Sequence, residues 1–264
     1  MIINTGRSIL SISYQGIYNI AYHLITVKRR KQDSSADSSP LKSEPIATLM
    51  EALILYFVLF FPGVSVSSFH RVNTETIPFS ILLELNRTLT YTIPAMALLW
   101  YLMSDKKGIS ALEEEKPGAR DLFPFIIGLP CLILIGLGLS FLITRLPVSS
   151  ELAPPPRVEA PISVIGYIVM VIACLGTGYL EESYFRYYLL TKFENMLPRP
   201  EFRIALSTIL FSTCHIYEGP WGMLNSVLAG ILLSVLFIRF KSLHGIAWAH
   251  GAYNVFVYIM GNFL

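Results

Sequence analysis

The sequence predicts an all-α fold, a polytopic helical membrane protein with seven or eight transmembrane helices, from its composition and its apolar runs. Of its 264 residues, 53% are hydrophobic and only 14% are charged, whereas soluble domains average about 25% charged residues. The mean hydropathy is +0.57. A chain of this length cannot keep so much apolar surface away from water, which excludes an ordinary soluble protein. The apolar residues form runs of about 20, the length that a spanning helix needs.

Seven runs are interpreted as spanning helices, and an eighth segment is ambiguous. Ile9–Val27 contains Gln15, Asn19 and His23, so it either spans the bilayer or lies in the interface as an amphipathic anchor. Only helices and closed barrels satisfy the backbone in lipid, and runs of this length indicate helices. The seven predicted spans are Ala52–Phe69, Phe79–Met103, Leu122–Leu146, Ile162–Leu190, Phe202–Tyr217, Trp221–Phe240 and His244–Leu264.

Basic residues alternate from loop to loop, and this alternation predicts the orientation. Loops rich in lysine and arginine face the cytoplasm by the positive-inside rule, so the C-terminus lies on the far side. We therefore expect a multi-pass protein of the cell inner membrane. The basic, cytoplasmic segments are 28–46, 104–121, 191–203 and 239–243.

Cysteine spacing and net charge exclude several classes of function. The three cysteines lie within apolar runs and form no CxxC pair, which argues against a disulfide framework and a zinc ribbon. The formal net charge is only +2 and the basic residues are scattered, so no nucleic-acid partner is expected. The expected partners are the lipid bilayer and a peptide or protein substrate in or at the membrane.

Ionisable residues inside spans are costly and usually functional, and seven of those in the predicted spans are informative. Glu84 and Arg87 stand three apart on one helix face, and we interpret them as a structural ion pair near the external end. The other five belong to three motifs on separate spans. They are Glu181, Glu182, Arg186, His215 and His250.

The first motif contains two adjacent glutamates and an arginine. Glu182 and Arg186 are four apart in the favourable order, so we expect them to pair. Neighbouring helix positions point about 100° apart, so the two glutamates cannot serve one pocket equally. Glu181 is then left without a sequence-local cation. A carboxylate held in an apolar site can act as a base or an acid, although a second ion-pair role for Glu181 stays open.

The other two motifs each place two side chains on one helix face. Phe211 and His215 are four apart, as are His250 and Asn254. Each histidine alone could equally serve as a hydrogen-bonding residue between helices. Gly251, next to His250, allows a neighbouring helix to approach closely.

Together the three motifs indicate amide hydrolysis within a membrane. One spare carboxylate, two histidines and a carboxamide can activate a water and stabilise an oxyanion. The predicted spans place Glu181 and His215 at different depths, so at least one span limit must be displaced. His244, at the start of the last span, is interpreted as an interfacial residue only.

The ordered set EExxxR, FxxxH and HxxxN resembles the CAAX-processing and bacteriocin-processing (CPBP, or Abi) intramembrane endopeptidases, relatives of the type II CAAX prenyl endopeptidase. The resemblance covers residues of about 160–260 and implies a protease-like core there. It departs at Tyr187, where the family usually has a small residue. We expect residues 1–46 to form an N-terminal helix and a basic, Ser-rich cytoplasmic linker. Residues 47–264 would then form the helical membrane domain.

The resemblance implies a role for each matching residue. Glu181 would activate the water with His215, and His250 with Asn254 would hold the developing oxyanion. The substrate would be a prenylated C-terminus, a leader peptide or another membrane-associated peptide, reached from the cytoplasmic side. The supporting residues would be Glu182, Arg186 and Phe211.

No cofactor is favoured, and zinc is the alternative. Glu181, His215 and His250 supply a His₂Glu set with an open fourth position, a known catalytic zinc arrangement. Such an enzyme also needs a nearby general base. The only nearby spare acid is Glu182, which is expected to be paired with Arg186. A glutamate-type peptidase is therefore favoured over a metallopeptidase.

Two other functions remain open at this point. A non-catalytic immunity or scaffold protein could retain the fold, although loss of a motif residue would be expected and none is lost. A small proton-coupled transporter could use the same intramembrane groups, but it predicts paired half-helices or inverted repeats, and the sequence shows neither.

Overall fold

The computed structural model describes residues 45–60, 76–103, 116–145 and 157–260. The predicted segment Ile9–Val27 and most of the basic linker lie outside the described residues. The chain divides into two units, residues 1–65 and 66–264, and each is described by itself. In the first unit the described element is α2 (Pro45–Leu59), a short apolar helix.

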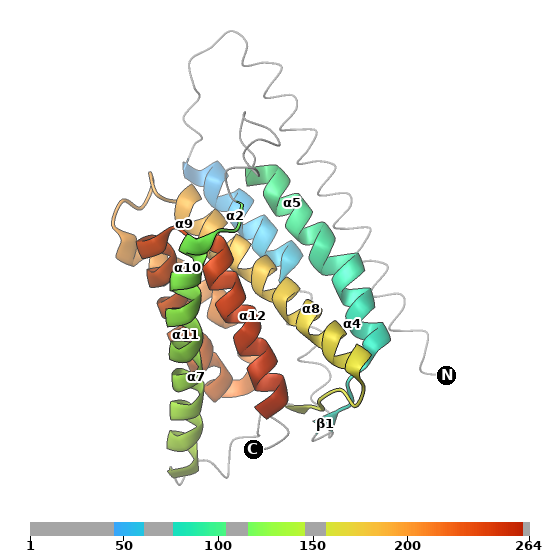
Figure 1. Cartoon of the computed structure of the whole chain (residues 1–264). Helices are drawn as coiled ribbons and strands as arrows, with labels where there is room; N and C mark the ends of the chain where they lie inside the picture. Colours follow the sequence, from blue (N-terminus) through green and yellow to red (C-terminus); the bar gives the residue numbers. More distant parts are fainter. Residues whose placement is uncertain (1–44, 61–75, 104–115, 146–156, 261–264) are drawn as a thin grey trace. The chain divides into compact units, whose positions relative to one another are not determined.

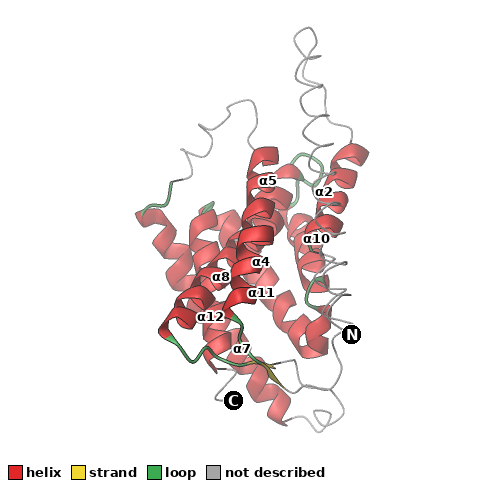
Figure 2. Ribbon diagram, turned by 90° about the vertical axis from the view of Figure 1, so that its right-hand side faces the viewer, coloured by secondary structure: helices red, strands yellow, loops and turns green. Residues whose placement is uncertain are grey.

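The second unit is built from helices, so the all-α prediction is confirmed (Figure 1). Figure 2 shows the same helices after a quarter turn. Two of the long helices contain a π-helical stretch, η2 and η5. The elements are β1 (Thr76–Ile77), α4 (Ile81–Arg87), η2 (Thr88–Thr92), α5 (Ile93–Met103), η3 (Ala119–Asp121), α7 (Leu122–Arg145), β2 (Arg157–Val158), α8 (Val164–Glu182), η5 (Ser183–Tyr188), α9 (Leu189–Lys192), α10 (Pro200–Thr213), η6 (Ile216–Glu218), α11 (Gly219–Phe240) and α12 (Leu243–Met260).

Three of the described helical stretches are long and apolar enough to cross a membrane. They match three of the predicted spans to within a few residues, and the longest of them joins α8, η5 and α9. Exposed isoleucines and valines on the first turns of α8 suit a surface in contact with lipid. The three stretches are Ala119–Ile143, Val164–Lys192 and Ile216–Phe240.

Glycines bring α8 and α12 into close contact. A Cβ on Gly178 would lie 2.9 Å from both the carbonyl oxygen of Ala247 and the backbone nitrogen of Gly251. A Cβ on Gly251 would lie 2.8 Å from the Cα of Leu175. The expected close approach at Gly251 is therefore confirmed. The other side of α12 packs on α7 and α11, around a core that includes Leu132, Leu233, Phe237, Ile246 and Tyr253.

Loops that were predicted to share a side of the membrane lie together. At one end, β1 and β2 pair in parallel, with Thr76 opposite Arg157. At the other end, the Ser242 hydroxyl donates to the Asp121 carboxylate at 2.6 Å. The first contact joins two loops predicted to be external, and the second joins two predicted to be cytoplasmic. Each of these two contacts thus joins loops that were predicted to lie on the same side of the membrane.

The predicted span Phe202–Tyr217 ends too late. Helix α10 has 14 residues and ends at Thr213, so it is roughly 21 Å long, short of the ~30 Å hydrocarbon core. His215 therefore lies in the turn before η6 rather than inside a helix. The chain reverses at Gly219, whose φ of 80° is a conformation that glycine adopts most readily. The expected displacement of a span limit is thus found at the end of this helix.

Candidate active site

Three segments of the second unit contribute the predicted site residues. The end of α8 and the start of η5 supply the glutamates and the arginine, the end of α10 supplies Phe211 and His215, and α12 supplies His250 and Asn254. The close α8–α12 packing sets the position of His250 relative to the glutamates. The predicted pair of Glu182 and Arg186 is confirmed, with 2.9 Å between Nη1 and Oε1 and both side chains fully buried.

Glu182 also fixes the orientation of the His250 ring. The Nδ1 atom of His250 lies 2.7 Å from the same Oε1 that accepts from Arg186. The Glu182 oxygen is already ion-paired with Arg186 and acts as an acceptor, so Nδ1–H of His250 donates the hydrogen bond in this contact. The arginine and the histidine thus share one carboxylate oxygen. These two partners compensate the negative charge of Glu182, which burial alone would strongly disfavour.

Glu181 faces the second nitrogen of the same imidazole. Its Oε2 lies 3.5 Å from Nε2 of His250, and its side chain is 16% exposed. The two adjacent glutamates meet the ring unequally, since Glu182 is fully buried and hydrogen-bonded to it whereas Glu181 is partly exposed and farther away. The imidazole ring lies between the two carboxylates, and one nitrogen faces each of them. Although neighbouring side chains on α8 point in different directions, a ring that comes from another helix can contact both of them.

Phe211 contacts both histidines and the arginine. Its buried ring centre lies 4.7 Å from the His215 ring and 5.8 Å from the His250 ring. The guanidinium carbon of Arg186 lies 4.3 Å from the same ring centre, which is within the range of a cation–π interaction. Phe211 therefore links the motif on α10 to those on α8 and α12.

The tautomer of His215 follows from its backbone contact. Its Nδ1 lies 3.0 Å from the carbonyl oxygen of Phe211. A carbonyl only accepts, so Nδ1 donates in this contact, and in the neutral form of the imidazole the lone pair is on Nε2. The ring of Tyr217 stacks on His215, with centroids 6.4 Å apart. His215 can thus accept a proton at Nε2 while its orientation is held from two sides.

Asn254 lies one turn beyond His250 on the same face of α12. Its side chain is half-buried and makes no hydrogen bond with another described residue. The amide lies beside His250 because the two residues are four apart on α12. It is therefore available to a bound group.

Sequence reasoning missed several contacts around the site. His244 was expected to be interfacial, but it is buried and its Nδ1 lies 2.9 Å from the Tyr179 hydroxyl. The hydroxyl of Ser207 donates to the Phe185 carbonyl at 2.7 Å, which supports the π-helical stretch η5. No local pattern predicts these contacts, because each joins residues on different helices.

The described residues contain no group of three His, Cys, Asp or Glu side chains arranged to hold a metal ion. In the predicted alternative set of Glu181, His215 and His250, the last residue presents both ring nitrogens to carboxylates. His215 stands one phenyl ring away from it. Glu181, His215 and His250 are thus not grouped as three ligands of one ion among the described residues.

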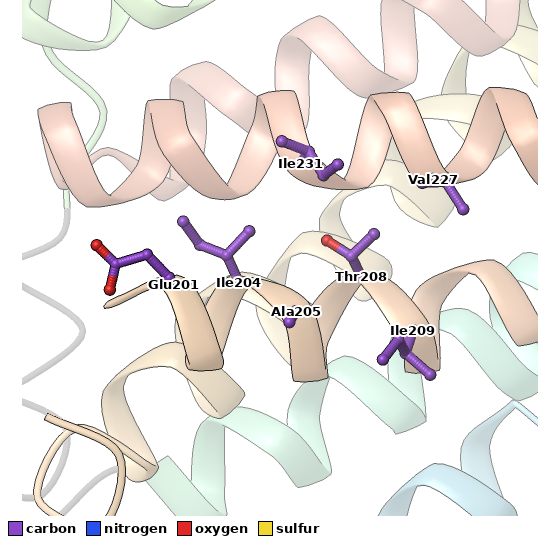
Figure 3. Close-up of a pocket in the computed structure, with 7 residues that line it drawn as sticks. All are labelled: Glu201, Ile204, Ala205, Thr208, Ile209, Val227 and Ile231. Carbon is purple, nitrogen blue, oxygen red and sulfur yellow. The ribbon is translucent and has the colours of Figure 1, made fainter. Parts of the chain in front are cut away.

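A groove of about 350 Å³ lies between α10 and α11 (Figure 3). Its lining is mostly apolar, and Figure 3 shows that it runs along the facing sides of the two helices. None of the predicted site residues lines it. Its residues are Glu201, Ile204, Ala205, Thr208, Ile209, Val227 and Ile231.

Comparison with known families supports the resemblance seen in the motifs. Residues 163–256 match the profile of the family described as type II CAAX prenyl endopeptidase Rce1-like. The matched segment contains all of the predicted catalytic and supporting residues. No curated protein and no solved structure matches the chain.

Proposed function

Because residues 163–256 belong to the type II CAAX prenyl endopeptidase Rce1-like family, the protein is a CAAX-protease-like intramembrane endopeptidase, and we propose that it hydrolyses its substrate with a water activated by Glu181 and His215. The observation that carries this proposal is the position of His250 between two carboxylates. Glu182 accepts from one ring nitrogen, and Glu181 faces the other.

The charges of the buried groups support distinct roles for the two glutamates. With Nδ1 donating to Glu182, a second proton on Nε2 makes His250 a cation that faces Glu181. The formal charges of the two carboxylates, this cation and Arg186 then sum to zero, which suits a region of low dielectric constant. In this state Glu181 is an ionised base, and His250 is a hydrogen-bond donor.

The reaction follows from these protonation states. A water near Glu181 and Nε2 of His215 gives a proton to Glu181 as its oxygen attacks the scissile carbonyl carbon. The developing oxyanion accepts hydrogen bonds from Nε2 of His250 and the amide of Asn254. Glu181 then passes the proton to the departing amine nitrogen, and the carbon–nitrogen bond breaks. Glu182 and Arg186 hold His250 in place throughout.

The family match and the predicted orientation of the chain support a substrate class and a side of entry. We propose that membrane-associated peptides, prenylated or leader-type, reach the site from the cytoplasm. The partial exposure of Glu181 supports access for water or substrate, since Glu182 beside it is fully buried. The loops that meet near Asp121 and Ser242 would face the cytoplasm.

Comparative proteomics of membranes tests this function. Membranes that contain the wild-type protein should accumulate cleaved peptides that are absent with Glu181→Gln, because the amide keeps the volume but cannot take a proton. Glu201→Gln, an exposed position on α10, is the matched control and should behave as wild type. Identical peptide profiles for wild type and Glu181→Gln would contradict the proposal.

A further inference from the structure

His215 lies on a turn, so the backbone of α10 does not fix the position of its imidazole. Helix α10 ends at Thr213, and His215 has φ −102° and ψ 11°, between the helical and extended regions. Its amide donates to the Ser212 carbonyl at 3.0 Å, and its carbonyl accepts from the Glu218 amide at 3.0 Å. The orientation of the ring therefore depends on contacts made by residues 214–219.

Tyr217 packs against the face of this imidazole from within the same turn. The two rings are stacked, with centroids 6.4 Å apart and an angle of 20° between their planes. Tyr217 also lies within electrostatic range of Glu181, so it borders the proposed site. A tyrosine in such a place usually needs a partner for its hydroxyl group.

Glu218, the residue just before α11, supplies that partner. The Tyr217 hydroxyl donates a hydrogen bond to the Glu218 carboxylate. The glutamate side chain in turn lies over Gly222, one turn along α11. A Cβ on Gly222 would overlap the Cβ of Glu218 and would lie 2.7 Å from its Oε2. The absence of a side chain at position 222 thus leaves room for the carboxylate.

Two contacts together determine how the imidazole is held. The Nδ1 atom of His215 donates to the Phe211 carbonyl at 3.0 Å. The outer torsion of a histidine side chain is broad, so one hydrogen bond alone leaves the ring free to swing about that contact. The stacked ring of Tyr217 limits this rotation, and Glu218 limits the motion of Tyr217.

We propose that Glu218 is a positioning residue of the hydrolysis, which acts through Tyr217 to hold Nε2 of His215 toward the attacking water. This inference rests on the proposed peptidase function and adds two residues to it. Neither residue reacts with the substrate, since both act through the imidazole. A displacement of about 1 Å in such a group can lower a rate about 100-fold.

The kinetic test uses the full-length protein in lipid nanodiscs and the peptide that it cleaves best from an internally quenched, N-terminally acylated library. Tyr217→Phe keeps the ring and removes the hydroxyl, and Glu218→Ala removes its acceptor. Each should lower kcat roughly 10- to 100-fold with KM unchanged. Glu218→Gln keeps an acceptor and should retain most of the kcat. Tyr167→Phe removes a hydroxyl from an exposed tyrosine on α8 and should behave as wild type.

Two further variants show whether the residues act through one contact. Tyr217→Phe/Glu218→Ala should lose no more activity than either single variant, because both changes break the same interaction. Gly222→Ala displaces Glu218 and should also lower kcat, although the glutamate itself is retained. Additive losses in the double variant would overturn the assignment.

The tautomer of His215 gives a readout that a merely structural role would not change. Solid-state nitrogen NMR of protein with isotope-labelled histidine, compared with His215→Gln, identifies the signal of this residue. In the neutral wild-type ring the proton should lie on Nδ1. Tyr217→Phe and Glu218→Ala should show a mixture of tautomers. An unchanged signal in both variants would overturn the proposal, even if thermal unfolding in detergent showed a loss of stability.

Failure of the peptidase function gives a different result. A wild-type protein that cleaves no peptide of the library would refute that function, and the positioning role would fall with it. Cleavage that is lost in Glu181→Gln but keeps its wild-type kcat in Tyr217→Phe and Glu218→Ala would refute the positioning role alone.

Discussion

His250 donates from Nδ1 to the Oε1 atom of Glu182 at 2.7 Å, and the same oxygen accepts from Arg186. This contact determines which ring nitrogen of His250 can serve a substrate. It also places the second nitrogen opposite Glu181. The predictions about the two glutamates and about Asn254 depend on this arrangement.

The two glutamates should respond differently to the same substitution. Glu181→Gln should abolish turnover and leave the protein folded. Glu182→Gln should lower the free energy of unfolding by about 3–5 kcal/mol, because it removes the partner of a buried arginine. Chemical denaturation in detergent, followed beside a peptide-cleavage assay, measures both effects. Purely catalytic losses of equal size, with unchanged stability, would contradict this division of roles.

Gly178→Ala should reduce both stability and activity. The new methyl group would meet the backbone of α12 at 2.9 Å, and overpacking of this kind costs about 1–3 kcal/mol. Separation of α8 from α12 would also move the glutamates away from His250, and a shift of about 1 Å can lower a rate about 100-fold. The measurements are thermal unfolding in detergent and kcat.

Gly138 on α7 provides the matched control for that substitution. A Cβ at this position would meet no atom within 4 Å. Gly138→Ala should therefore be neutral or stabilising by roughly 0.5–1 kcal/mol, with unchanged kcat. If the two alanine variants lose activity to the same extent, the close packing at Gly178 does not position the site.

Asn254→Ala should lower kcat by roughly 10²–10³ with little change in KM. That range is typical for the loss of one oxyanion donor, and the amide contributes to the proposed mechanism only when charge develops on the carbonyl oxygen. Steady-state kinetics with a quenched peptide measures both constants. A rise in KM at constant kcat would assign Asn254 to ground-state binding instead.

Metal removal tests the glutamate-type mechanism directly. The purified enzyme should stay active in strong chelator after metal analysis shows less than stoichiometric zinc. The expected reason is that Glu181 and His215 activate the water themselves. Activity that vanishes in chelator and returns when zinc is added to the metal-free protein would decide for a metallopeptidase.

Cysteine labelling measures the orientation of the chain in the membrane. Cysteines introduced at Ser35 and Ser110 should react with impermeant reagent from the cytoplasmic side, and a cysteine at Ser150 from the far side. Basic-residue bias sets the orientation of helical membrane proteins, and all three positions lie outside the described residues. The reverse pattern for Ser110 and Ser150 would invert the topology and remove cytoplasmic access to the site.

Local spacing in the sequence was sufficient to predict the contacts within single helices. Glu182 with Arg186 and Glu84 with Arg87 form the expected pairs, because helical periodicity alone places residues three or four apart side by side. Composition likewise determined the helical membrane fold, since apolar runs of spanning length have few other solutions.

Only the tertiary structure decided how the motifs meet. His250 lies between both glutamates because Gly178 and Gly251 let two helices touch through their backbones. His215 approaches His250 across Phe211 because α10 is short and ends at Thr213. Contacts between helices depend on packing among residues far apart in the sequence, and helical periodicity carries no information about which faces will meet.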